Sequence, residues 1–193
     1  KLMKRLSIYL FLLLFSIQTP SWADDIRDLQ IEGMSVGESL LDYFSEEEIN
    51  TNIEKNMFIG SDGKYTSSGI YRKFGEYDGI QFAYKTNDNK YIIHSISGGI
   101  FYSDIEKCKK KLKLISREVS ELFKGAETNF DFKQFHPTDK SGKSYAVSDG
   151  FFLETGSISI KCTDWSDEIS KKYNWDDNLR VGIKSKEFND WLP

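Results

Sequence analysis

Two histidines are the side chains best suited to proton transfer near neutral pH. His94 alternates with Ile92 and Ile96, which predicts a histidine packed in the core or at a sheet edge rather than a base. His136 precedes Pro137 in a predicted loop, and no serine or cysteine nucleophile motif accompanies it. We therefore expect no histidine-based catalytic triad.

Carboxylates are abundant, and a pair of them could act as general acid and base or hold a hard cation. Near the C-terminus they cluster at Asp164, Asp167, Glu168, Asp176 and Asp177. This cluster lacks the D-x-[DN]-x-[DN]-G pattern of a calcium loop, so a solvated acidic surface is the simpler interpretation. We predict no metal site and no cofactor. A hydrolase that uses two carboxylates stays open, because its catalytic pair needs only to meet in space.

Aromatic residues form the third candidate for chemistry. They crowd the segment from Tyr71 to Tyr102, where amphipathic rings could line a groove for a sugar, a peptide or a protein partner. We select Tyr71, Tyr77 and Tyr84 as candidate binding residues. More than half of the aromatic residues in this segment are instead expected to pack in the core or in cross-strand pairs.

The two cysteines are expected to form a disulfide. Cys108 belongs to the apolar stripe of a predicted helix, and Cys162 follows Ile158 and Ile160 at a spacing of two, which puts all three side chains on one face of a strand. If the helix covers that face, both sulfur atoms point into one layer. A redox-active pair is disfavoured because no C-x-x-C motif is present.

The long helix is predicted over Asp104 to Lys124. Its apolar residues recur at spacings of three and four, and Ser103 with Glu106 forms the S-x-x-E pattern of a helix cap. Gly125 is the residue type that commonly ends a helix. Lys109, Lys110, Lys111 and Lys113 fall on the opposite side of this helix, where they indicate a solvated surface.

Alternating apolar residues predict two hairpins, in 80–102 and 145–162, and a last strand at 179–183. Two short helices are expected near Leu40 to Ile53, the second opened by Ser45 and Glu48, and two more after Cys162. Helices and hairpins are segregated, which favours an α+β fold. We expect an antiparallel sheet of about five strands, one long helix across one face and short helices at both ends.

The N-terminal residues predict an export signal. Lys4 and Arg5 precede an apolar run that ends at Ile17, and the small residues at Ser21 and Ala23 suit a signal peptidase. The run is shorter than the roughly 20 apolar residues that span a bilayer. We therefore expect a signal peptide in 1–23, a single α+β domain in 24–193, and no membrane span after cleavage.

Removal of the predicted signal leaves 23 of the 26 basic residues and all 30 acidic ones, a net charge of −7. Such a surface does not favour nucleic acid or anionic lipid as a partner. An even number of cysteines also fits an oxidising compartment, so we expect a periplasmic or secreted protein.

The segment IEGMSVGESLLDYFSEEEI resembles the start of a group of uncharacterised short exported proteins of marine bacteria. The likeness covers the leader and the N-terminal helical part. It implies a bacterial, exported protein and identifies no catalytic residue.

Three functions follow as hypotheses. The first is a non-enzymatic binding or interaction module that contacts another envelope protein or a small ligand, because catalytic motifs are missing from the sequence. The second is a small hydrolase of envelope polymers that uses carboxylates. The third is a purely structural envelope protein.

Overall fold

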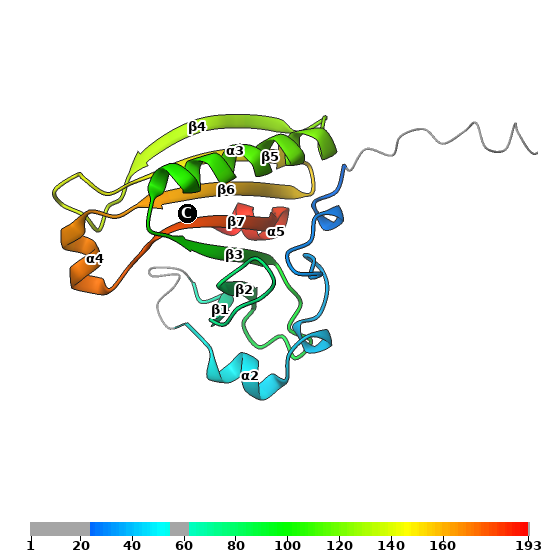
Figure 1. Cartoon of the computed structure of the whole chain (residues 1–193). Helices are drawn as coiled ribbons and strands as arrows, with labels where there is room; N and C mark the ends of the chain where they lie inside the picture. Colours follow the sequence, from blue (N-terminus) through cyan, green and yellow to red (C-terminus); the bar gives the residue numbers. More distant parts are fainter. Residues whose placement is uncertain (1–23, 55–61, 193) are drawn as a thin grey trace, which may run out of the picture.

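The computed structural model describes residues 24–54 and 62–192, so the predicted export signal lies outside the described residues. The fold is α+β, with one antiparallel sheet in the order β1-β2-β3-β7-β6-β5-β4 (Figure 1). The strands are β1 (Tyr65–Ile70), β2 (Gly79–Lys85), β3 (Ser95–Tyr102), β4 (Glu127–Phe135), β5 (Tyr145–Leu153), β6 (Gly156–Asp164) and β7 (Asp177–Ser185).

The sheet has seven strands, and the prediction of about five was wrong in number. The two strands that sequence patterns missed are β1 and β4, which lie at the two edges. Strand β1 reads YTSSGI and lacks apolar alternation. All nine residues of β4 are exposed, and the alternation of Phe130 and Phe132 does not continue to Phe135. Edge strands have one neighbour instead of two, which weakens their sequence signal.

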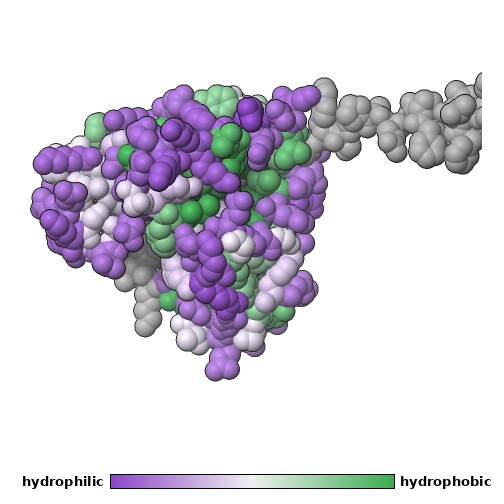
Figure 2. Space-filling view, viewed as in Figure 1, coloured by the Kyte–Doolittle hydropathy of each residue, from purple (hydrophilic) through white to green (hydrophobic). Residues whose placement is uncertain are grey.

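The long helix is α3 (Ile105–Leu122), and it lies across β6 and β7 (Figure 1). Its cap differs from the prediction: the Asp104 carboxylate, not Ser103, accepts a hydrogen bond from the backbone N–H of Glu106. Its buried side chains are Cys108, Leu112, Ser116 and Val119. The outward side is largely hydrophilic (Figure 2), and three of its four clustered lysines form salt bridges.

The core lies on one face of the sheet, under α3 and under the N-terminal segment, which adds Ile26, Leu40 and Ile49. Beneath α3 this face presents Ile158, Ile160 and Cys162 on β6, and Leu179, Val181 and Ile183 on β7, all of them buried. Cys108 and Cys162 form the expected disulfide, with 6.0 Å between their Cα atoms. The two periodicities that placed these sulfur atoms in one layer are therefore confirmed.

Shorter helices complete the fold: η1 (Ile26–Asp28), η2 (Leu40–Asp42), α2 (Glu46–Thr51), α4 (Asp167–Tyr173) and α5 (Lys186–Trp191). Helix α2 begins as predicted, with the Ser45 hydroxyl accepting from the Glu48 N–H. Helix α5 lies on the sheet face opposite α3, where Phe188 packs with Tyr65 and Ala83. Within the described residues, α3 thus covers β6 and β7 on one face, and the short helix α5 covers part of the other.

A buried carboxylate ties α3 to the edge of the sheet. Asp149 on β5 is 1% exposed, and its side chain accepts a hydrogen bond of 2.8 Å from the backbone N–H of Asp131. The register of β4 shifts at this point, and Asp131 adopts a φ of 56°. Lys113 of α3 reaches the same carboxylate at 3.2 Å. Asp149 therefore stabilises a bulge on β4 and an ion pair with the helix at once.

Removal of the disulfide should destabilise the fold. In the chain-entropy description, a closure with a sequence separation of 54 contributes roughly 4 kcal/mol. We expect the Cys108→Ala/Cys162→Ala protein to unfold at clearly lower urea concentration than the oxidised protein. Urea unfolding with and without dithiothreitol measures this. An unchanged midpoint would contradict the role of the bond.

Replacement of Asp149 by alanine should cost about 2 kcal/mol, because it leaves the Asp131 N–H without its acceptor and Lys113 without a buried partner. Urea unfolding measures the change. Asp131→Asn is the matched control: it removes a largely exposed carboxylate that also contacts Lys113, and should change stability little. Equal losses in both variants would show that burial of Asp149 does not matter.

Candidate functional site

The face of the sheet opposite α3 is polar. In an antiparallel sheet, residues directly opposite one another point to the same side. Lys161 on β6 pairs with Arg180 on β7, and Arg180 pairs in turn with Gly99 on β3. Strands β6 and β7 alternate apolar residues with Ser159, Lys161, Arg180 and Lys184. The same alternation that builds the core therefore gathers hydroxyl and cationic side chains on the other face.

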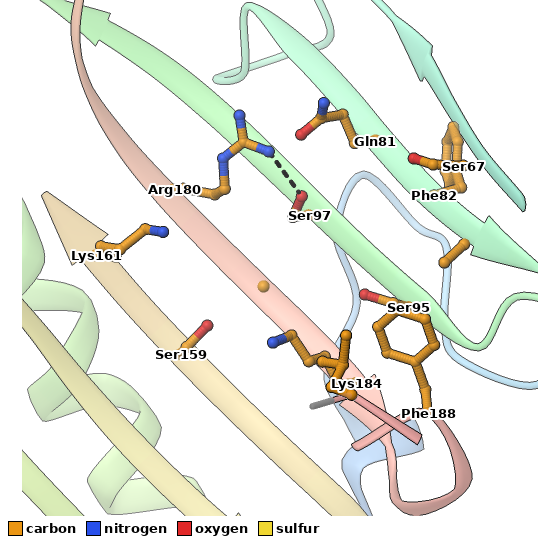
Figure 3. A pocket seen from close by; sticks show the side chains of 13 residues that line it. Ser67, Gln81, Phe82, Ser95, Ser97, Ser159, Lys161, Arg180, Lys184 and Phe188 are labelled. Carbon is orange, nitrogen blue, oxygen red and sulfur yellow. Dashed lines mark hydrogen bonds between the residues drawn. The ribbon is translucent and has the colours of Figure 1, made fainter. Parts of the chain in front are cut away.

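These side chains line a pocket of about 200 Å³ on the open face (Figure 3). We call it the cationic pocket. Its polar lining comes from five strands: Ser67 of β1, Gln81 of β2, Ser95 and Ser97 of β3, Ser159 and Lys161 of β6, and Arg180 and Lys184 of β7. Phe188 and Leu192, from α5 and the residue after it, close one end. The pocket thus depends on the whole sheet rather than on one loop.

The positive charges of Arg180 and Lys184 repel that of Lys161 in the pocket. Although water reaches Lys161, the surrounding protein desolvates its ammonium group and lowers its pKa, and the charges of Arg180 and Lys184 lower it further. Burial also lowers the pKa of Lys184 and of Arg180. A bound anion would offset both the desolvation and the repulsion.

These cations have no carboxylate partner within salt-bridge distance in 24–54 or 62–192. Arg180 Nη1 instead lies 3.5 Å from the Ser97 hydroxyl (Figure 3). Elsewhere lysines do find acids: both Lys64 and Lys85 reach Glu187. The arrangement in the pocket is therefore a local concentration of positive charge in a chain of net negative charge.

The carboxylate whose charge acts on Arg180 is Glu54, and it is already engaged in hydrogen bonds. It accepts from Gln81 Nε2 at 2.7 Å and from the Ser67 hydroxyl at 3.0 Å. The hydroxyl of Tyr71 also donates to it. Four side chains thus form one network beside the pocket, and Arg180 keeps its guanidinium available to a ligand.

The three tyrosines that we predicted as binding residues are not brought together. Tyr71 is 59% exposed and lies beside Arg180 on the open face. Tyr77 packs over Gly98, whose strand partners belong to the face under α3. Tyr84 is 4% exposed, with its hydroxyl 3.2 Å from that of Ser68. One of the three is therefore a neighbour of the pocket, and the other two pack on the opposite side of the sheet.

Sequence reasoning missed Lys161, Arg180 and Lys184. A signal was present in β7, where Arg180 and Lys184 alternate with Leu179, Val181 and Ile183 and so share the solvent-facing side of a half-buried strand. Nothing in the sequence alone indicated that Lys161 lies opposite Arg180, because that pairing depends on the register of β6 against β7.

The histidines and the C-terminal acidic cluster that the sequence suggested for chemistry do not line the cationic pocket. The pocket lining, within the part of the chain that the structure describes, contains no carboxylate and no histidine. His94 Nδ1 lies 3.4 Å from the Ser185 hydroxyl, and burial lowers the pKa of His94. No group of three or more acidic, histidine or cysteine side chains suited to a metal ion occurs among the described residues. The polar side chains of the cationic pocket are therefore lysine, arginine, serine and glutamine.

Comparisons of the chain with protein-family models, with curated proteins and with solved structures gave no match. The interpretation of the site therefore rests on its geometry.

Loss of one pocket cation should stabilise the ligand-free protein. We expect Lys161→Met to unfold at higher urea concentration than wild type at pH 7, because the mutation removes repulsion and desolvation. The pKa of Lys161 is lower folded than unfolded, so its destabilising effect is complete below the folded pKa. This effect fades as pH rises toward the unfolded value of about 10.4, and the advantage of the variant should shrink.

Lys107→Met is the matched control for this measurement. Lys107 is an exposed residue of α3 on the other side of the sheet, so its removal changes net charge equally without touching the pocket. A gain of the same size in both variants would attribute the effect to net charge and would contradict a local origin.

Proposed function

We propose that this protein is an exported binding module whose cationic pocket holds the anionic group of a ligand. The observation that carries the proposal is the convergence of Lys161, Arg180 and Lys184 in a pocket of about 200 Å³ without a carboxylate partner among the described residues. A protein bears the desolvation of three cations more readily when a ligand supplies the counter-charge.

The chemistry of the pocket favours an oxyanion. Arginine presents a planar fork that matches carboxylate, phosphate and sulfate groups, and lysine adds a mobile charge. Hydroxyl groups of Ser95, Ser97 and Ser159 surround the same space and can donate further hydrogen bonds. The volume suits one small anionic group with its immediate attachment, not a folded partner.

Binding is favoured over the hydrolase hypothesis. The hydrolase that we considered needs two carboxylates, one of which protonates a leaving group. The cationic pocket offers cations and hydroxyls where those carboxylates would have to stand. A purely structural role is disfavoured too, because it gives no reason to gather on one surface three cations that have no carboxylate partner among the described residues.

We place this function in the periplasm or outside the cell. The disulfide supports an oxidising compartment. Within the described residues, none of the helices has the length and apolar character to cross a membrane. The export signal in 1–23 remains part of this proposal.

Thermal unfolding in phosphate, sulfate or acetate against chloride at equal ionic strength tests the proposal. A ligand that binds only the folded state raises the transition temperature, and at a hundredfold excess over Kd it adds about 2.7 kcal/mol. We expect a rise in wild type that Lys161→Met and Arg180→Met lose. The rise should also diminish as pH increases, because Lys161 deprotonates below its ordinary pKa.

Lys107→Met again serves as control and should keep the full response. Arg180→Lys keeps the charge but not the fork, so it should retain part of the rise. The proposal fails if no oxyanion stabilises wild type beyond chloride, or if the pocket variants respond as strongly as wild type.

A further inference from the structure

A cluster of aromatic rings lies beyond one end of the sheet. We call it the ring cluster; it consists of His136, Trp165, Tyr173 and Trp175. The ring centroids of Trp165 and Trp175 are 4.7 Å apart, and Tyr173 stacks on Trp175 with an interplanar angle of 23°. Tyr173 is 41% exposed and Trp175 38% exposed. These rings therefore support one another while part of their surface stays open to solvent.

The ring cluster continues the face that carries the cationic pocket. Lys161 and Thr163 of β6 and Trp165, which directly follows the strand, fall at a spacing of two, which places them on one side. On the other flank, the His136 N–H donates to the Ser144 carbonyl at 2.9 Å and so extends the pairing of β4 with β5. His136 reaches Trp165 across this row, with 4.4 Å between the ring centroids.

The two features are close enough for one extended ligand. Trp165 follows Lys161 by four positions, a distance of about 13 Å along an extended backbone. Lys161 also contributes to the lowered pKa of His136, which places its charge within electrostatic range of the rings. A ligand longer than a single pyranose ring can therefore reach both.

We propose that the ligand is an acidic oligosaccharide, with one acidic group in the cationic pocket and a neighbouring sugar stacked on the ring cluster. This inference rests on the proposed function. Sugars present one face of C–H groups to an aromatic ring and direct their hydroxyls to the sides, and exposed indole and phenol rings suit such contacts. Between the two features lie Thr163 and its strand partner Asn178, whose side chains are neutral.

A nucleotide fits the same surface less well. A base could stack on Trp175, but a nucleotide carries its charge on phosphates and has few hydroxyls to match the serine-rich lining. Acidic sugars carry either carboxylate or sulfate groups, and both are oxyanions that the fork of Arg180 can hold. The experiment therefore includes both kinds of acid.

Isothermal titration calorimetry tests the inference. The full-length protein is titrated with trigalacturonate and, separately, with a sulfated trisaccharide. We expect at least one to bind more tightly than inorganic phosphate. Trp175→Ala should weaken that binding about tenfold, the loss expected from one aromatic contact. It should leave the phosphate response unchanged. The tighter of the two trisaccharides identifies the acidic group.

Two further variants keep the test decisive. Tyr173→Ala removes the other exposed ring and replaces Trp175→Ala if that protein does not fold, as judged by circular dichroism. Phe135→Ala is the matched control: Phe135 is 61% exposed and pairs with Tyr145 on the side of the sheet that faces α3. It should bind both trisaccharides as wild type does.

The outcomes separate the two proposals. If phosphate binds in the cationic pocket but neither acidic trisaccharide binds more tightly, the inference fails and the proposed function stands. The inference also fails if galactotriose binds as tightly as trigalacturonate, or if ADP binds more tightly than both acidic trisaccharides. If Lys161→Met leaves trisaccharide and phosphate binding intact, both proposals fail.

Discussion

The structure depends on a single constraint: α3 is the only long helix among the described residues, and it covers β6 and β7 on one face of the sheet. Side chains alternate along a strand, so burial of one face under α3 commits every second residue of β6 and β7 to the core. Cys162 and Val181 lie on that face. Lys161 directly precedes Cys162 and Arg180 directly precedes Val181, so both cations must point to the open face. The disulfide between α3 and β6 holds this assignment in place.

The cationic pocket works against stability. Its charges are partly desolvated and repel one another, and the nearby carboxylate of Glu54 is occupied by Gln81, Ser67 and Tyr71 instead of neutralising Arg180. Proteins commonly keep such unfavourable arrangements at sites of function, where a ligand makes use of them. The fold tolerates the arrangement because the apolar layer on the other side of the same strands supplies most of the burial.

The sequence predicted the core of this fold better than its edges or its site. Apolar residues recur every three to four positions in α3 and every two positions in β6. These two strong signals together predicted the disulfide between Cys108 and Cys162. Strand β4 was missed because its alternation is short: Phe130 and Phe132 lie two apart, but Phe135 follows after three, and a bulge interrupts the pairing before Phe132. The site was missed for another reason. Lys161 and Arg180 lie 19 positions apart and meet only through the register of two strands, which no local pattern encodes.

The acidity of the whole chain constrains what the cationic pocket can do. At physiological salt, charges separated by more than about 8 Å are largely screened, so the negative surface neither attracts an anion from afar nor strongly repels one. Recognition must therefore come from contacts at short range. Charge alone in a small open pocket is a weak basis for selectivity, because abundant inorganic anions such as chloride and phosphate would compete for the same site. In the binding that we propose, hydroxyl groups around the cations and aromatic rings at the end of the same face supply the directional contacts that distinguish one ligand from another. Under this proposal the neutral part of the ligand, rather than its charge, determines which molecule is bound.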